Sequence, residues 1–117
     1  RLRQALSSGG SETLVEDILH VLTPRTAYYG KSLTIIQSMA DPTYVFEKIK
    51  ILDNGGQLPK SKTTNAAAGW RHDTVSTGSS NDLRLYYRPE AGGVWVSLGY
   101  KRDQKRDIRQ LPQFNMQ

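Results

Sequence analysis

Residues 83–100 read LRLYYRPEAGGVWVSLGY, and they indicate the fold most clearly because apolar and polar positions alternate on both sides of a glycine-containing turn. Alternation with a period of two is typical of strands that bury one face. Residues 83–88 and 94–100 therefore predict two antiparallel strands, and residues 89–93 predict the hairpin connection between them. Residues 70–76 predict a third strand of the same meander.

The alternation also assigns the side chains of these strands to two faces of the sheet. The apolar face is expected to pack against helices and contains Leu83, Leu85, Tyr87, Val94, Val96 and Leu98. The opposite face is expected to be open and contains Arg84, Tyr86, Arg88, Trp95, Ser97, Gly99 and Lys101. The open face would thus combine cations with aromatic rings.

Two segments before the strands show helical spacing. Apolar residues recur at steps of three and four in residues 11–22, and Pro24 ends this helix. A second helix is predicted from the Asp-Pro pair at 41–42 to Asn54, which two glycines follow. Residues 32–39 (SLTIIQSM) suit either a strand or a buried helical turn, so both interpretations stay open.

Together these elements predict an α+β architecture, with N-terminal helices packed on one face of a small antiparallel β-meander. A length of 117 residues suits a single domain with a modest core. We expect residues 1–10, which end in Ser-Ser-Gly-Gly, to be a flexible tether and residues 11–117 to be the domain. Because the chain begins with Arg1 rather than methionine, we also expect it to be a fragment of a longer polypeptide.

Charge is unevenly distributed along the chain. The formal net charge is +5 and the sequence pI is about 9.6, values at which nucleic acid is a plausible partner. Residues 1–56 contain six basic and six acidic residues, whereas residues 57–117 contain ten basic and five acidic ones. The whole excess therefore lies in the second half, where it indicates either a polyanion-binding surface or an ordinary solvated one.

Composition excludes several kinds of site. The absence of cysteine rules out disulfides, thiolate metal ligands and a cysteine nucleophile. His20 and His72 lack the spacing of metal ligands, and Asp73 and Asp82 are too isolated to indicate a two-metal nuclease site. We therefore expect no metal and no cofactor. No apolar run is long enough to cross a membrane.

The expected open face has the chemistry that single-stranded RNA requires, since cations hold phosphates while aromatic rings stack on bases. The basic segment 101–109 adds further cations at the end of the last strand. The residues predicted to bind RNA are Arg71, Tyr86, Arg88, Trp95, Lys105 and Arg106.

Cleavage of RNA requires more than binding. The 2′-hydroxyl must be deprotonated, the phosphorane stabilised by cations and the leaving 5′-oxygen protonated. His72 is the candidate acid or base, because only histidine titrates near neutrality without perturbation. His20, at the end of the first helix, is the weaker candidate, and a purely structural role for His72 remains the alternative.

The strands also resemble a known family. Residues 83–87 (LRLYY), a glycine turn and residues 94–102 (VWVSLGYKR) are similar to the C-terminal strands of RelE-like ribonuclease toxins, part of the barnase, EndoU and colicin-type group of bacterial toxin nucleases. The residues that this resemblance places at the scissile phosphate are Arg84 and either Lys101 or Arg102, with Arg71 or His72 as a further candidate. The start of the chain resembles the C-terminal toxin module of contact-dependent inhibition and other polymorphic toxins.

The sequence therefore predicts a metal-independent endoribonuclease toxin that cleaves tRNA or mRNA, with His72, Arg84, Lys101 and Arg102 as its catalytic residues. Such a toxin implies RNA and a cognate immunity or antitoxin protein as partners, and action in the cytoplasm of a target cell after delivery by a secreted carrier. The alternatives are a non-catalytic RNA-binding module and a protein-interaction domain.

Overall fold

The computed structural model describes residues 12–39, 41–64, 67, 69–75 and 82–111. The expected tether at 1–10, Ser11, the last residue of the strand predicted at 70–76 and residues 77–81 lie outside them. Within the described residues the chain forms an α+β fold of four α-helices and a five-stranded, mostly antiparallel sheet. The predicted fold class is therefore confirmed.

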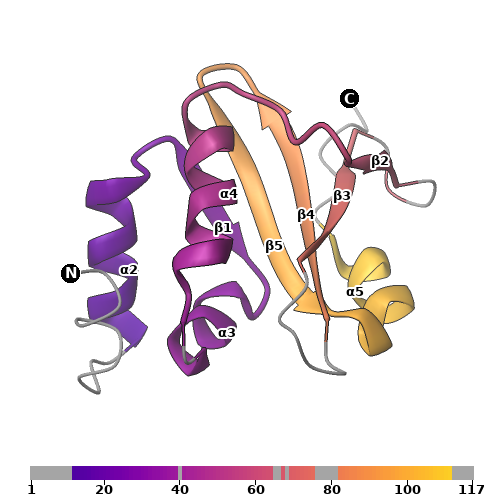
Figure 1. Cartoon of the computed structure of the whole chain (residues 1–117), viewed down its shortest axis with the longest axis horizontal. Helices are drawn as coiled ribbons and strands as arrows, with labels where there is room; N and C mark the ends of the chain where they lie inside the picture. The colour runs from indigo at the N-terminus through magenta and orange to yellow at the C-terminus, as the bar shows by residue number, and fades with distance from the viewer. Residues whose placement is uncertain (1–11, 40, 65–66, 68, 76–81, 112–117) are drawn as a thin grey trace.

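The sheet has the strand order β1-β5-β4-β3-β2 (Figure 1). Its strands are β1 Thr26–Tyr29, β2 Lys62–Thr63, β3 Arg71–Val75, β4 Leu83–Glu90 and β5 Gly93–Tyr100. All neighbouring strands are antiparallel except β1, which runs parallel to β5. The predicted three-strand meander is confirmed as β3, β4 and β5, and β1 and β2 extend it at its two edges.

The hairpin between β4 and β5 has the register that the sequence alternation requires. Leu85 pairs with Leu98 and Glu90 with Gly93, so the turn itself consists of two residues, 91 and 92. Gly92 has a φ of 76°, a left-handed conformation that glycine adopts without a Cβ clash. The turn residue and the strand pattern thus favour the same register.

Helical segments account for most of the remaining chain. They are α2 Glu12–Leu22, α3 Ser32–Ser38, α4 Thr43–Asp53, the short 3₁₀ helix η1 Lys101–Asp103 and α5 Gln104–Gln110. Both predicted helices are confirmed as α2 and α4. The ambiguous segment is helix α3, because it buries the adjacent residues Ile35 and Ile36 in one core, whereas a strand would direct them to opposite faces.

The main hydrophobic core lies between the sheet and the layer formed by α2, α3 and α4 (Figure 1). From the sheet it takes Val75, Leu83, Leu85, Tyr87, Val94, Val96 and Leu98, and from the helices Leu19, Ile35, Ile36, Val45, Ile49 and Leu52. The predicted apolar face is confirmed residue by residue. We call it the helix face of the sheet.

We call the opposite side of the sheet the second face. It carries Lys62, His72, Thr74, Arg84, Tyr86, Arg88, Trp95, Ser97 and Gly99. The prediction that this face is open is wrong for its middle, where Ala67, Trp70, Tyr86 and Leu111 form a second buried apolar cluster. Helix α5 lies on this side, opposite α2 and α4 (Figure 1).

Helix α5 and strand β1 had no signal in the sequence pattern. Helix α5 (QKRDIRQ) contains a single aliphatic residue, Ile108, so it shows no apolar period. Strand β1 has four residues, and its parallel pairing with β5 joins Thr26 to Val94 across most of the chain. Both elements depend on contacts distant in sequence, which local patterns do not report.

Candidate functional site

A row of polar side chains crosses the second face at the edge formed by β2, β3 and β4. Lys62 and Tyr86 lie directly opposite His72 on the two neighbouring strands. Arg84 lies opposite Thr74, diagonally from His72, a relation that separates Cβ atoms by about 7–8 Å. The sheet register therefore brings one histidine and two cations together.

His72 is held by a neighbouring hydroxyl and surrounded by positive charge. Its Nδ1 lies 3.0 Å from Thr64 Oγ1 in a hydrogen bond, and its ring centroid is 6.4 Å from that of Tyr86. Burial lowers the pKa of His72, and the charges of Arg84 and Lys62 lower it further. The imidazole is consequently neutral at pH 7, and its Nε2 is the ring nitrogen that Thr64 does not engage.

Arg84 is oriented by two neutral acceptors. Its Nε donates to Gln104 Oε1 at 2.7 Å, and its Nη1 donates to Thr74 Oγ1. Among residues 82–111 and the other described ranges, no carboxylate forms an ion pair with Arg84 or Lys62. Arg84 is thus held in place, and neither Arg84 nor Lys62 is neutralised by a carboxylate of the described residues.

Tyr86 does not lie where the sequence placed it. The prediction that its ring is open for base stacking is wrong, because the side chain is fully buried beneath Ala67, Trp70 and Leu111. Within the described part of the chain its hydroxyl has no hydrogen-bond partner. Burial raises the pKa of Tyr86 to about 12, Asp107 adds to this increase and Arg84 opposes it. Tyr86 therefore packs beside the site and does not offer its ring to a base.

Arg88 and Trp95 form a different environment at the other end of the second face. The Arg88 guanidinium carbon lies 5.1 Å from the centre of the Trp95 ring, and Nε is 2.8 Å from Glu90 Oε2. The Arg88 side chain is only 16% exposed. Both residues share a face with Arg84, as predicted, but the charge of Arg88 is already paired.

Arg71 is separated from His72 by the pleat of β3. It shares the helix face with its partner Tyr87, and its guanidinium donates to Ser61 Oγ at 2.9 Å and to Ser61 O at 2.7 Å. The Ser61 hydroxyl in turn lies 2.7 Å from Tyr87 Oη. Arg71 thus ties the loop before β2 to the sheet. It lies on the other side of the sheet from His72, because adjacent strand residues point to opposite sides. The RNA-binding role expected for Arg71 stays a prediction.

The basic segment after β5 is folded rather than extended. Lys101 and Arg102 belong to η1 and are exposed, and the guanidinium carbon of Arg102 lies 5.0 Å from the centre of the Tyr100 ring. Lys105 and Arg106 are exposed residues of α5, and Arg106 Nη2 is 3.3 Å from Asp103 Oδ2. Gln104, which follows η1, connects this segment to Arg84.

The second histidine lies elsewhere. His20 is an exposed residue at the end of α2, in the helix layer on the other side of the sheet (Figure 1). The structure therefore does not bring the two histidines together, and His72 is the one surrounded by cations.

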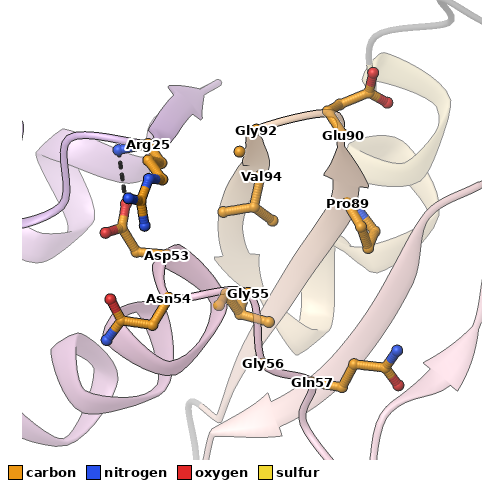
Figure 2. A pocket seen from close by; sticks show the side chains of 12 residues that line it. Arg25, Asp53, Asn54, Gly55, Gly56, Gln57, Pro89, Glu90, Gly92 and Val94 are labelled. Atoms are coloured by element: carbon orange, nitrogen blue, oxygen red, sulfur yellow. Dashed lines mark hydrogen bonds between the residues drawn. The ribbon is translucent and has the colours of Figure 1, made fainter.

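A hollow of about 330 Å³ lies at the opposite end of the sheet, between the end of α4 and the β4–β5 turn (Figure 2). Asp53, which lines it, accepts hydrogen bonds through Oδ1 from the Arg25 amide at 2.8 Å and from Thr26 Oγ1 at 2.9 Å. Figure 2 shows this carboxylate turned towards the Arg25 backbone. Asp53 therefore connects the chain before β1 to the end of α4, a structural role.

Sequence reasoning missed four residues of the site. Lys62, Thr64, Thr74 and Gln104 contact or face His72 and Arg84. Lys62 had a partial signal, since it lies in a polar loop with Lys60. The other three are short or neutral polar residues whose role depends on their neighbours in space.

Across the described residues, no helix is long and apolar enough to cross a membrane, and no three His, Asp or Glu side chains form a group that could hold a metal ion. No protein-family model, no curated protein and no solved structure matches this chain.

Proposed function

We propose that this chain is a metal-independent endoribonuclease of the toxin type. The observation that carries the proposal is the placement of His72 beside two cations, Arg84 and Lys62, that no carboxylate of the described residues neutralises. The lowered pKa of His72 favours the neutral imidazole. A neutral imidazole can accept a proton at pH 7, and unpaired cations attract and hold a phosphate.

In the proposed reaction His72 Nε2 takes the proton of the 2′-hydroxyl. The 2′-oxygen attacks the adjacent phosphorus, and the bond from phosphorus to the 5′-oxygen breaks. The proton held by His72 then passes to the leaving 5′-oxygen, directly or through water, and the product is a 2′,3′-cyclic phosphate. Arg84 and Lys62 stabilise the charge that develops on the phosphorane oxygens. Lys101 and Arg102 would bind the RNA backbone beyond the scissile phosphate.

The test is incubation of the purified chain with total RNA, tRNA and a labelled RNA oligonucleotide in EDTA. We expect cleavage, with rates at least about 100-fold lower for His72→Gln and for Arg84→Ala. An oligonucleotide with 2′-deoxyribose throughout should remain intact, because it lacks the nucleophile. His20→Gln and Lys50→Ala, which change a histidine and a cation of the helix layer, should cleave at the wild-type rate. Intact RNA with the wild-type chain, or cleavage that His72→Gln leaves unchanged, would refute the proposal.

The same cations also support the alternative of a non-catalytic RNA-binding module. That function would give affinity for the labelled RNA with a steep salt dependence but no cleavage. Absence of both affinity and cleavage would favour a protein-interaction domain.

A toxin function further implies a cognate immunity or antitoxin protein. A partner with an acidic surface over the second face would pair with Arg84 and Lys62 and block access to His72. We also propose action in the cytoplasm of a target cell, after delivery as part of a secreted carrier. Expression of this chain in the cytoplasm should arrest growth if the chain acts there. Co-expression of the gene adjacent to that of the carrier should restore growth if that gene encodes the immunity protein.

A further inference from the structure

Two arginines of β4, four residues apart, share the second face, but their guanidinium groups have different partners. Arg88 forms an ion pair with Glu90 and stacks on Trp95. Arg84 instead donates to the amide oxygen of Gln104 and to the hydroxyl of Thr74. Of these two arginines, Arg84 is the one whose guanidinium is oriented without a carboxylate partner among the described residues.

The neutral amide of Gln104 matters because a carboxylate in its place would change the charge of the site. A carboxylate at this distance from Arg84 Nε would form a charge-assisted pair and cancel the positive charge. An amide oxygen accepts the same hydrogen bond without a formal charge. Gln104 is thus suited to orient Arg84 while leaving it able to bind an anion.

The packing of helix α5 on the sheet places Gln104 beside Arg84. Gln104 is its first residue, and Asp107, one turn later, is buried with its Oδ2 against Gly99 of β5. A Cβ at Gly99 would overlap this oxygen, so the glycine permits the close approach of α5 to the sheet. Ile108 and Leu111 add apolar contacts with the second cluster.

We propose that Gln104 is a positioning residue that holds the Arg84 guanidinium in a phosphate-binding orientation without neutralising it. This inference rests on the proposed function, because it assigns Arg84 to the phosphate of RNA. Gln104 itself does not touch the substrate; it acts through Arg84.

The experiment compares Gln104→Glu and Gln104→Ala with the wild-type chain, using a 2′-O-methyl RNA oligonucleotide that binds but cannot be cleaved. In Gln104→Glu the carboxylate pairs with Arg84, so we expect affinity to fall about 10-fold and the slope of log affinity against log salt to become shallower by about one unit. In Gln104→Ala the charge of Arg84 is retained, so the slope should be unchanged while cleavage of ordinary RNA slows through kcat.

Two controls separate positioning from general charge and stability effects. Gln110→Glu makes the same charge change at an exposed position on the same helix and should leave the salt slope within error of wild type. Glu90→Gln releases Arg88 from its ion pair and should make the slope steeper without lowering kcat. A purely structural role for Gln104 would instead lower the thermal midpoint of both Gln104 variants and change their slopes equally.

The outcomes distinguish this inference from the proposed function. If wild-type chain binds RNA but does not cut it, the ribonuclease proposal fails, while the salt slopes still test Gln104. If RNA is cut and Gln104→Glu behaves like Gln110→Glu, the positioning role is overturned and the ribonuclease proposal stands. Wild-type chain that neither binds nor cuts RNA overturns both.

Discussion

The two faces of β4 show how one strand can serve stability and a functional site at once. On the helix face Leu83, Leu85 and Tyr87 are almost completely buried against α2, α3 and α4 and belong to the main core. On the second face Arg84 is half-buried and retains a charge without a carboxylate partner in the described residues, while Tyr86 beside it is fully buried. Successive side chains of one strand thus enter environments of opposite polarity.

The accessibility of the second face therefore depends on which elements cover it, and the alternation of side chains along β4 does not report this. Helix α5 and the residues around Trp70 cover the middle of this face and bury Tyr86. At the β2–β3 edge, His72 and Lys62 remain outside that cluster. The site therefore occupies the part of the face that the second apolar cluster leaves uncovered.

The largest effect should come from truncating the helix face. Leu85→Ala removes a fully buried side chain and should lower the free energy of unfolding by about 2–5 kcal/mol, measured by urea denaturation. Arg84→Ala, one position earlier on the second face, loses two hydrogen bonds at a half-buried site and should cost less, about 1–3 kcal/mol. Equal losses of unfolding free energy for Leu85→Ala and Arg84→Ala would contradict the view that the helix face stabilises the fold more than the second face does.

A smaller effect is expected where α5 meets the second face. In Gly99→Ala the new methyl group overlaps Asp107 Oδ2, so α5 must shift, and we expect a loss of about 1–3 kcal/mol. Asp107→Ala in the same background removes the overlapping atoms and should restore most of that loss. A double variant no more stable than Gly99→Ala alone would show that the contact does not limit the position of α5.

The adjacent tyrosines give a finer comparison of the faces. Tyr87→Phe deletes a buried hydroxyl that bonds to Ser61 and should cost about 0.5–1.5 kcal/mol. Tyr86→Phe deletes a buried hydroxyl with no partner in the described residues, so its unfolding free energy should be unchanged or higher. Parallel urea titrations measure both, and a larger loss for Tyr86→Phe would indicate a bond to that hydroxyl.

The smallest effect concerns the protonation of His72. Its pKa is lowered in the fold, so the unfolded chain binds the proton more readily. The stability that His72 contributes is therefore present above its unfolded pKa of about 6.5 and is lost as pH falls through the lower folded value. His72→Gln should flatten the dependence of unfolding free energy on pH in this acidic range. Cleavage by the wild-type chain should likewise decline only below about pH 6.5.

Sequence alternation was sufficient for the central hairpin and for the side chains that face the helices. It failed for α5, whose sequence has one aliphatic residue and no period, and for the parallel edge strand β1. It also placed Tyr86 on an open face, because alternation predicts the side of a sheet but not what covers that side.

For the candidate site, the sequence identified His72 and Arg84 but gave no reason to select Gln104, Thr64 or Thr74. These neutral residues carry no chemical signature, and their contacts join positions 8 to 20 residues apart. The sequence predicted RNA-binding roles for Arg71 and Arg88, but it could not show that Arg71 is bonded to Ser61 or that Arg88 is paired with Glu90.

The amino-acid pattern alone was enough to predict the α+β class, the antiparallel hairpin of β4 and β5 and the identity of the buried strand face. These properties follow from local periodicity, because burying one face of a strand requires every second residue to be apolar. The folded arrangement was needed to learn which cations lack a carboxylate partner among the described residues and which aromatic rings are covered. Pairing and burial depend on neighbours brought together by folding, and neither is encoded in the spacing of residues along the chain.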